Sequence, residues 1–163
     1  RGGTLNAAGI VGMAEALVLA QSEREAFILH TKALRDAFEA RILSALNGEA
    51  SVDGGGVAAG GGAALGAAAV GEKSTERAPN LSHITFAGGG EWLIGALDLR
   101  GVACSGGAAC SAHAALPSHV MLAMGRSEEE AKRGVRFSFG AETTPREAEY
   151  AAETVVSVIR KEG

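Results

Sequence analysis

Cys110 is the residue whose type and surroundings most favour covalent chemistry. It lies in SGGAACSAHAA, residues 105–115, where Gly, Ala and Ser leave no bulky side chain near the thiol. A thiol on such a loop can be approached closely, but a reactive cysteine also needs a lowered pKa, or a base supplied by a substrate or cofactor. Only His113 could act as a base in the local sequence. The residues alone leave open that Cys110 is a small cysteine buried in a tight turn.

Cys104 has a different context, because it ends the apolar run GVAC at residues 101–104. We interpret it as a small hydrophobic residue that packs in the core. Zinc sites commonly use pairs of the form C-x2-C, and the spacing of Cys104, Cys110, His113 and His119 does not match such a pattern. No metal site is therefore predicted.

Two further residues could bind anions. Arg136 lies in GVRFSFG, residues 134–140, where strand alternation places Val135 and Phe137 on one face and Arg136 on the other. A solvated face would explain that pattern, but a guanidinium directed into a cleft would bind a carboxylate. Thr4 follows two glycines ahead of a helix, where its hydroxyl and nearby backbone N–H groups could bind a phosphate. Alone, that second signal is weak.

Helices and short strands must position these residues. Apolar residues at spacings of three and four predict helix over residues 7–47, with Asn6 as N-cap, Asn47-Gly48 as the stop and a bend near Gln21-Ser22. Alternation and turn residues predict strands at 81–86, 101–104 and 134–140, and helices at 91–100, 117–125, from 127 onward and at 145–160. The fold class is therefore α+β, with a short three-stranded sheet and helices packed on one face.

Composition narrows the class of protein. The chain has 163 residues, enough for one domain, and 18 of its residues form the Gly/Ala run 54–71, which we predict to be a flexible insertion. The net charge is −4 and no Lys/Arg cluster stands out, which argues against a nucleic-acid surface. No apolar run reaches the roughly 18 residues of a membrane span. Two cysteines make no disulfide framework, so reduced thiols in the cytoplasm are expected.

Several motifs, taken in order, resemble the NifS/IscS-type cysteine desulfurases. GVACSGGAACS at 101–111 resembles the nucleophile loop G-I-A-V-S-S-G-S-A-C-S, and VRFSFG at 135–140 resembles the strand I-R-F-S-L-G. RGGTLN at 1–6 resembles R-S/G-G-T-x-N, and APNLSHITF, PSHVMLAMG and TTPRE also fit. The similarity covers residues 1 to about 160, apart from the Gly/Ala insertion.

The resemblance implies a fold and a chemistry. Residues 1–163 would form the small C-terminal domain of the aspartate-aminotransferase-like fold of enzymes that use pyridoxal 5'-phosphate. Such desulfurases take sulfur from free L-cysteine, leave L-alanine and hold the sulfur as a persulfide. By motif match, Cys110 would carry the persulfide and Arg136 would bind the substrate carboxylate. Thr4 would contact the cofactor phosphate from the partner subunit of a homodimer, and a sulfur-acceptor or iron–sulfur scaffold protein would receive the sulfur.

The sequence also departs from the family pattern. The family's Schiff-base lysine belongs to a large domain that we expect before residue 1, and its motif matches none of the lysines here, which are Lys32, Lys73, Lys132 and Lys161. We therefore expect the 163-residue chain to be inactive alone. Two alternatives remain open. One is a non-catalytic binding or regulatory module of the same fold. The other is a related aminotransferase or lyase, for which Cys110 would not be needed.

Overall fold

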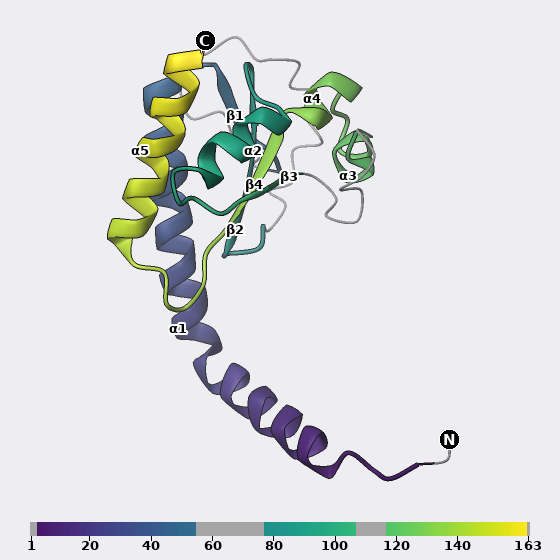
Figure 1. The fold of residues 1–163 in the computed structure, drawn as a ribbon. Helices are drawn as coiled ribbons and strands as arrows, with labels where there is room; N and C mark the ends of the chain where they lie inside the picture. The colour runs from purple at the N-terminus through teal and green to yellow at the C-terminus, as the bar shows by residue number, and fades with distance from the viewer. Residues whose placement is uncertain (1–2, 55–76, 107–116, 163) are drawn as a thin grey trace.

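The computed structural model describes residues 3–54, 77–106 and 117–162. Within these ranges the strands form an antiparallel four-stranded sheet with the order β1-β2-β4-β3 (Figure 1). The strands are β1 (Ala50–Val52), β2 (Leu81–Phe86), β3 (Ser105–Gly106) and β4 (Gly134–Ser138). The Gly/Ala insertion, from residue 55 onward, and the segment that contains Cys110 lie outside the described residues.

The α+β class is confirmed, but the prediction of three strands is wrong. β1 was missed because three residues are too few to show alternation, and it follows the end of a helix directly. The strand expected at 101–104 is displaced along the chain, because only the next two residues pair with β4. Residues 102–104 are apolar because they reach the core, where Val102 is buried, and not because they belong to the sheet.

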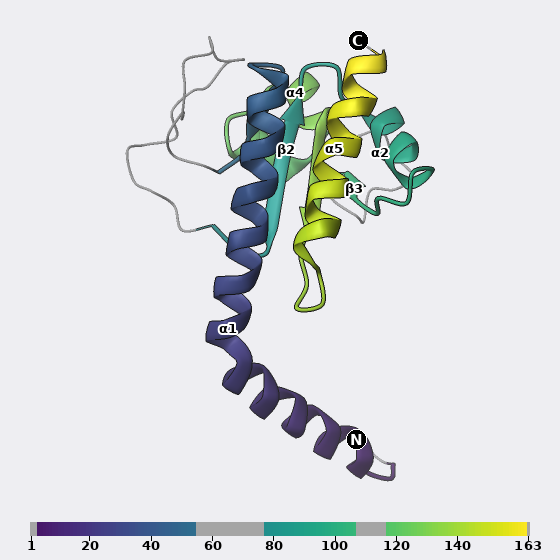
Figure 2. The ribbon, with the colours of Figure 1, turned by 90° about the vertical axis from the view of Figure 1, so that its left-hand side faces the viewer.

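The longest helix is α1 (Ala7–Leu46), which is continuous over 40 residues. Asn6 caps it as predicted, since its side-chain oxygen accepts a hydrogen bond from the Gly9 N–H at 3.0 Å. The helix stops at Asn47, whose φ of 23° lies in the left-handed region. Both views show the expected change of direction along α1 (Figures 1 and 2). The Ser22 hydroxyl donates to the Leu19 carbonyl at 2.8 Å, and such bonds often bend helices.

Among the described residues, four shorter helices follow: α2 (Glu91–Asp98), α3 (His119–Ala123), α4 (Glu128–Lys132) and α5 (Pro145–Glu162). The start of α4 is fixed by a capping box, in which the Ser127 hydroxyl accepts from the Glu130 N–H and the Glu130 carboxylate accepts from the Ser127 N–H. Thr144 and Glu147 make the same reciprocal pair at the start of α5. The helix starts predicted near residue 127 and at residue 145 are therefore confirmed.

The core lies between the sheet and the long helices. α1 and α5 run side by side over one face of the sheet (Figure 2), as predicted, and α2 packs beside α5. Ile84 and Val135 are paired in register and fully buried. The Phe38 ring from α1 lies 4.8 Å from the Phe137 ring of β4, measured between centroids. Burial of these side chains stabilises the sheet against the two helices.

The first half of α1 has a different environment. Residues 3–26 are all exposed, and they extend away from the sheet in both views (Figures 1 and 2). No described helix is long and apolar enough to cross a lipid bilayer. The exposed large apolar side chains of this half include Ile10, Val11, Met13, Leu17 and Val18.

Candidate functional site: the polar face of the sheet

The face of the sheet opposite the long helices carries polar side chains. In the register, His83 of β2 lies opposite Arg136 of β4, and Ser105 of β3 lies opposite Arg136 on its other side. Directly opposed residues point to the same face of a sheet. Thr85 follows His83 on this face by alternation, and Asp53 comes directly after β1. The strand register therefore gathers groups from four strand segments into one surface.

Asp53 is the most buried charged group of this face, with a side chain only 1% exposed. Its Oδ2 accepts hydrogen bonds from His83 Nδ1 at 2.6 Å and from the Thr85 hydroxyl at 2.8 Å. Its Oδ1 accepts from Arg126 Nε at 2.7 Å. Burial alone would raise the pKa of Asp53, but the hydrogen bonds from His83 and Thr85 and the Arg126 charge hold its pKa below the usual value. Asp53 is therefore an ionised, fully engaged carboxylate.

His83 is held in one orientation by this carboxylate. Because an ionised carboxylate can only accept hydrogen bonds, His83 Nδ1 must donate. The other ring nitrogen, Nε2, is buried and has no hydrogen-bond partner among the described residues. Gly134 provides the room for the ring, because a Cβ at that position would overlap the imidazole. The result is an oriented imidazole with one unused nitrogen above β4.

Arg136 also has an unused nitrogen. Its side chain is partly buried, and its Nε is buried without a hydrogen-bond partner within the part of the chain that the structure describes. A buried donor of this kind costs free energy unless a ligand or water satisfies it. Its burial disfavours the interpretation of Arg136 as an ordinary solvated residue. The prediction that Val135 and Phe137 share the opposite, apolar face is confirmed.

The other predicted site residues are Cys110 and Thr4. Cys110 lies outside the described residues, but Ser105, which pairs with Arg136, precedes it by five positions. Thr4 is exposed and lies just before α1, whose N-terminal end extends away from the sheet in both views (Figures 1 and 2). The proposed roles of Cys110 and Thr4 remain predictions.

Cys104 behaves as the sequence predicted. It is partly buried and packs against the apolar core. Burial, together with the negative charge of Asp98, raises the pKa of the Cys104 thiol. A raised pKa keeps the thiol protonated, so Cys104 is a poor nucleophile.

The described lysines do not fit a covalent link to pyridoxal phosphate. Such a link needs an amine that faces an enclosed site, whereas Lys32, Lys132 and Lys161 are all exposed on helices. Lys32 is moreover paired with Asp36 at 2.8 Å. None of these three described lysines is therefore placed to form that link, and no chemical step through the cofactor is assigned to them.

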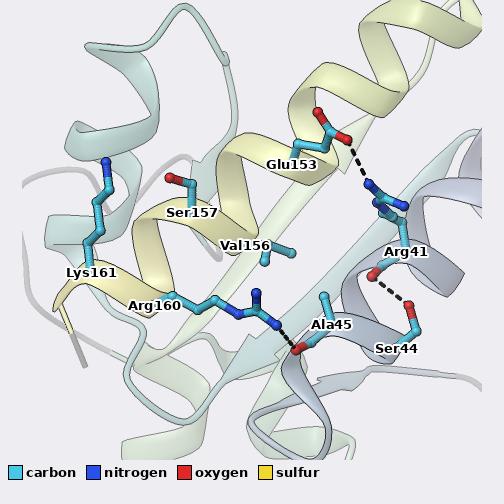
Figure 3. A pocket seen from close by; sticks show the side chains of 8 residues that line it. All are labelled: Arg41, Ser44, Ala45, Glu153, Val156, Ser157, Arg160 and Lys161. Carbon is cyan, nitrogen blue, oxygen red and sulfur yellow. Dashed lines mark hydrogen bonds and ion pairs between the residues drawn. The ribbon is translucent and has the colours of Figure 1, made fainter.

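A groove between α1 and α5 is a second candidate site (Figure 3). Two of its cationic side chains already have partners in the protein. Arg41 forms an ion pair with Glu153 at 2.7 Å, and Arg160 donates to the Ala45 carbonyl at 2.8 Å. The groove is therefore better explained as a contact between the helices than as a ligand site. It is lined by Arg41, Ser44, Ala45, Glu153, Val156, Ser157, Arg160 and Lys161.

Comparison with known proteins supports the resemblance seen in the sequence. Cysteine desulfurase IscS of Pseudomonas entomophila (strain L48) is 33% identical over 162 residues, which are 99% of this chain and 35% of that protein. The chain is related to the NifS/IscS-type cysteine desulfurases. Cysteine desulfurase IscS of Pseudomonas aeruginosa (strain LESB58) is 36% identical over the same share of both chains. The chain thus spans about a third of the length of the relatives it matches.

Solved structures support the NifS-like fold. A NifS-like protein from Rickettsia africae ESF-5 matches with a TM-score of 0.73 and 24% identity, over 98% of this chain and 36% of that one. Another NifS-like protein matches with a TM-score of 0.72 and 22% identity, over 99% of this chain and 35% of that one. No protein-family model matches the chain. The expected fold is therefore confirmed by structures as well as by sequence.

Proposed function

We propose that this chain is the part of a cysteine desulfurase that binds the carboxylate of the substrate L-cysteine and accepts the sulfur of that substrate. The observation that carries the proposal is Arg136, a partly buried guanidinium whose Nε has no partner in the described structure. A planar guanidinium suits a carboxylate, and L-cysteine presents one beside its amino group. The relation to proteins named cysteine desulfurase IscS supports this choice of substrate.

The reaction balances without an external oxidant. The C–S bond of L-cysteine breaks, and its sulfur forms an S–S bond with the sulfur of Cys110. Of the two thiol protons, one ends on the carbon that becomes the methyl group of L-alanine and the other remains with the persulfide. L-cysteine and a thiol thus give L-alanine and a persulfide, which a sulfur-acceptor or iron–sulfur scaffold protein would receive. Pyridoxal phosphate, when bound, would stabilise the negative charge that develops on the substrate. The lysine that binds this cofactor would come from the rest of a longer homodimeric protein in the cytoplasm. Thr4 would lie near the phosphate of the cofactor.

The test uses the full-length gene product loaded with pyridoxal phosphate. Formation of L-alanine from L-cysteine is measured for the natural protein, for Arg136→Gln and for the control Arg100→Gln. Arg100 is an exposed arginine just after α2, and its guanidinium donates to the Ala96 carbonyl of that helix. Loss of a charge-assisted hydrogen bond costs about 1.5–3 kcal/mol, so KM for L-cysteine should rise by about 10- to 100-fold in Arg136→Gln alone.

A second variant separates the competing functions. Cys110→Ala should abolish sulfur transfer, because no persulfide can form. An aminotransferase would instead move an amino group from an amino acid to a 2-oxo acid, and its rate would not depend on Cys110. A non-catalytic module would turn over no substrate in any variant. Either of these last two results would contradict the proposal.

A further inference from the structure

We propose that His83, oriented by Asp53, is a second ligand for the carboxylate that Arg136 binds. This inference rests on the proposed function, and it adds a residue that the sequence does not identify as part of a site. His83 and Arg136 face each other across β2 and β4. Each has one buried nitrogen without a partner among the described residues, Nε2 in His83 and Nε in Arg136.

The geometry explains why both nitrogens are left unpaired. Opposed residues of antiparallel strands have Cβ atoms about 5 Å apart, so a small anion can contact both side chains. Gly134 lies two residues before Arg136 on the same face, and its missing side chain lets the His83 ring extend over β4. Two buried nitrogens side by side without hydrogen bonds would destabilise the fold, and nothing would compensate for this free energy if the surface bound no ligand. A bound carboxylate removes that cost for both.

The hydrogen-bond inventory defines the protonation that the site requires. The Nδ1–H of His83 donates its hydrogen bond to Asp53. A neutral imidazole carries only that one hydrogen, so Nε2 can donate to a carboxylate only when the imidazole is protonated. The charged or polar groups around the ring are Asp53, Thr85, Arg126 and Arg136, with Glu130 beyond Arg126. A carboxylate bound at Nε2 therefore requires a proton on that nitrogen, so its binding depends on pH.

Asp53 therefore acts as a positioning residue, and its effect is separable from stability. If Asp53 fixes the Nδ1–H tautomer, Asp53→Asn should reduce both the affinity for the carboxylate and the pH dependence of its binding. A purely structural role would change stability but leave the pH dependence of binding as it is. His30, a partly buried histidine that contacts the Thr143 carbonyl at 2.9 Å, serves as the matched control.

The first experiment measures KM for L-cysteine against pH in the full-length protein. His83→Gln should raise KM about tenfold, leave kcat within twofold, and weaken the pH dependence of KM, whereas His30→Gln should change none of these. An unchanged KM in His83→Gln, together with a raised KM in Arg136→Gln, would overturn this inference and leave the proposed function intact.

The second experiment does not require activity. L-alanine is titrated into the ¹⁵N-labelled protein, with L-alanine methyl ester as the probe that lacks a carboxylate. The Nε2 resonance of His83 and the Nε resonance of Arg136 should both move with L-alanine and neither with the ester. Movement of the Arg136 resonance alone would overturn the His83 assignment. If neither resonance moves, the carboxylate site of the proposed function is wrong as well.

Discussion

The two faces of the sheet differ in how their side chains are satisfied. On the helix-covered face, Ile84, Val135 and Phe137 are buried against other apolar side chains. On the opposite face, Asp53 is saturated with hydrogen bonds, while His83 and Arg136 each retain one buried nitrogen without a described partner. Neighbouring residues of the same strands thus belong to a completed core and to an incomplete polar surface.

This difference separates stability from function along single strands. Because side chains alternate, Arg136 and Phe137 are consecutive in β4 but have unrelated environments. Substitutions on the apolar face should change the free energy of unfolding. Substitutions at the unsatisfied nitrogens should instead change ligand binding, because those atoms contribute little to the folded structure in the absence of a ligand.

The largest expected effect is on the apolar face. Phe137→Ala removes a buried ring that packs against the Phe38 ring in the core, and should lower the free energy of unfolding by about 3–5 kcal/mol. Arg136→Gln should change it by less than about 0.5 kcal/mol, since no described partner is lost. Urea unfolding followed by circular dichroism measures both. If both substitutions lowered the free energy of unfolding equally, the proposed division between a stabilising face and a ligand-binding face would be contradicted.

A smaller loss is expected for the saturated carboxylate. Asp53→Ala leaves Arg126 and His83 without their shared acceptor, at a cost of about 2–3 kcal/mol. Asp53→Asn keeps an oxygen acceptor and should cost less. The same unfolding experiment checks both variants. An Asp53→Ala protein as stable as the natural one would contradict the hydrogen-bond network described above.

Gly134 should be sensitive to any added side chain. Gly134→Ala places a Cβ against the His83 ring, which must move, so a loss of about 1–2 kcal/mol is expected. The matched control is Gly95→Ala in α2, where a Cβ meets no atom and should stabilise the helix by about 0.5–1 kcal/mol. Thermal unfolding compares the two. A shift of the same sign in both variants would argue against the tight fit at Gly134.

The smallest expected effect is on the free energy of unfolding at acidic pH. The pKa of Asp53 lies below its ordinary value of 3.8 in the folded state, so its ionisation favours folding above that pH and ceases to do so as the pH falls through the lowered value. The stability difference between the natural protein and Asp53→Asn should therefore narrow below pH 3.8. The lowered pKa values of Glu130 and Glu147 affect both proteins alike and cancel. A constant difference would mean that the pKa of Asp53 is not lowered.

Local chemistry made much of the fold predictable. Asn6, Ser127 and Thr144 mark helix starts because their side chains accept backbone N–H groups, and those contacts are present. β2 and β4 show enough alternation to be recognised. The short strands β1 and β3 do not, because their existence depends on pairing with distant residues.

The candidate site was predictable only in part. Arg136 stands out because a charged residue interrupts an apolar strand. Asp53, His83 and Arg126 belong to three separate segments, and only the sheet register and the turn before α4 bring them together. Each looks like an ordinary polar residue in the sequence. A signal was present in the alternation of His83 and Thr85 with buried apolar neighbours, but it does not identify their partner.

The central proposal is that this chain accepts sulfur from L-cysteine on Cys110. The most direct measurement is the mass of the Cys110 peptide after the full-length protein has been incubated with L-cysteine, trapped with iodoacetamide and digested. We predict a Cys110 peptide heavier by one sulfur atom, which Arg136→Gln reduces at low L-cysteine concentration. Extra sulfur on Cys104, or on neither cysteine, would contradict the account.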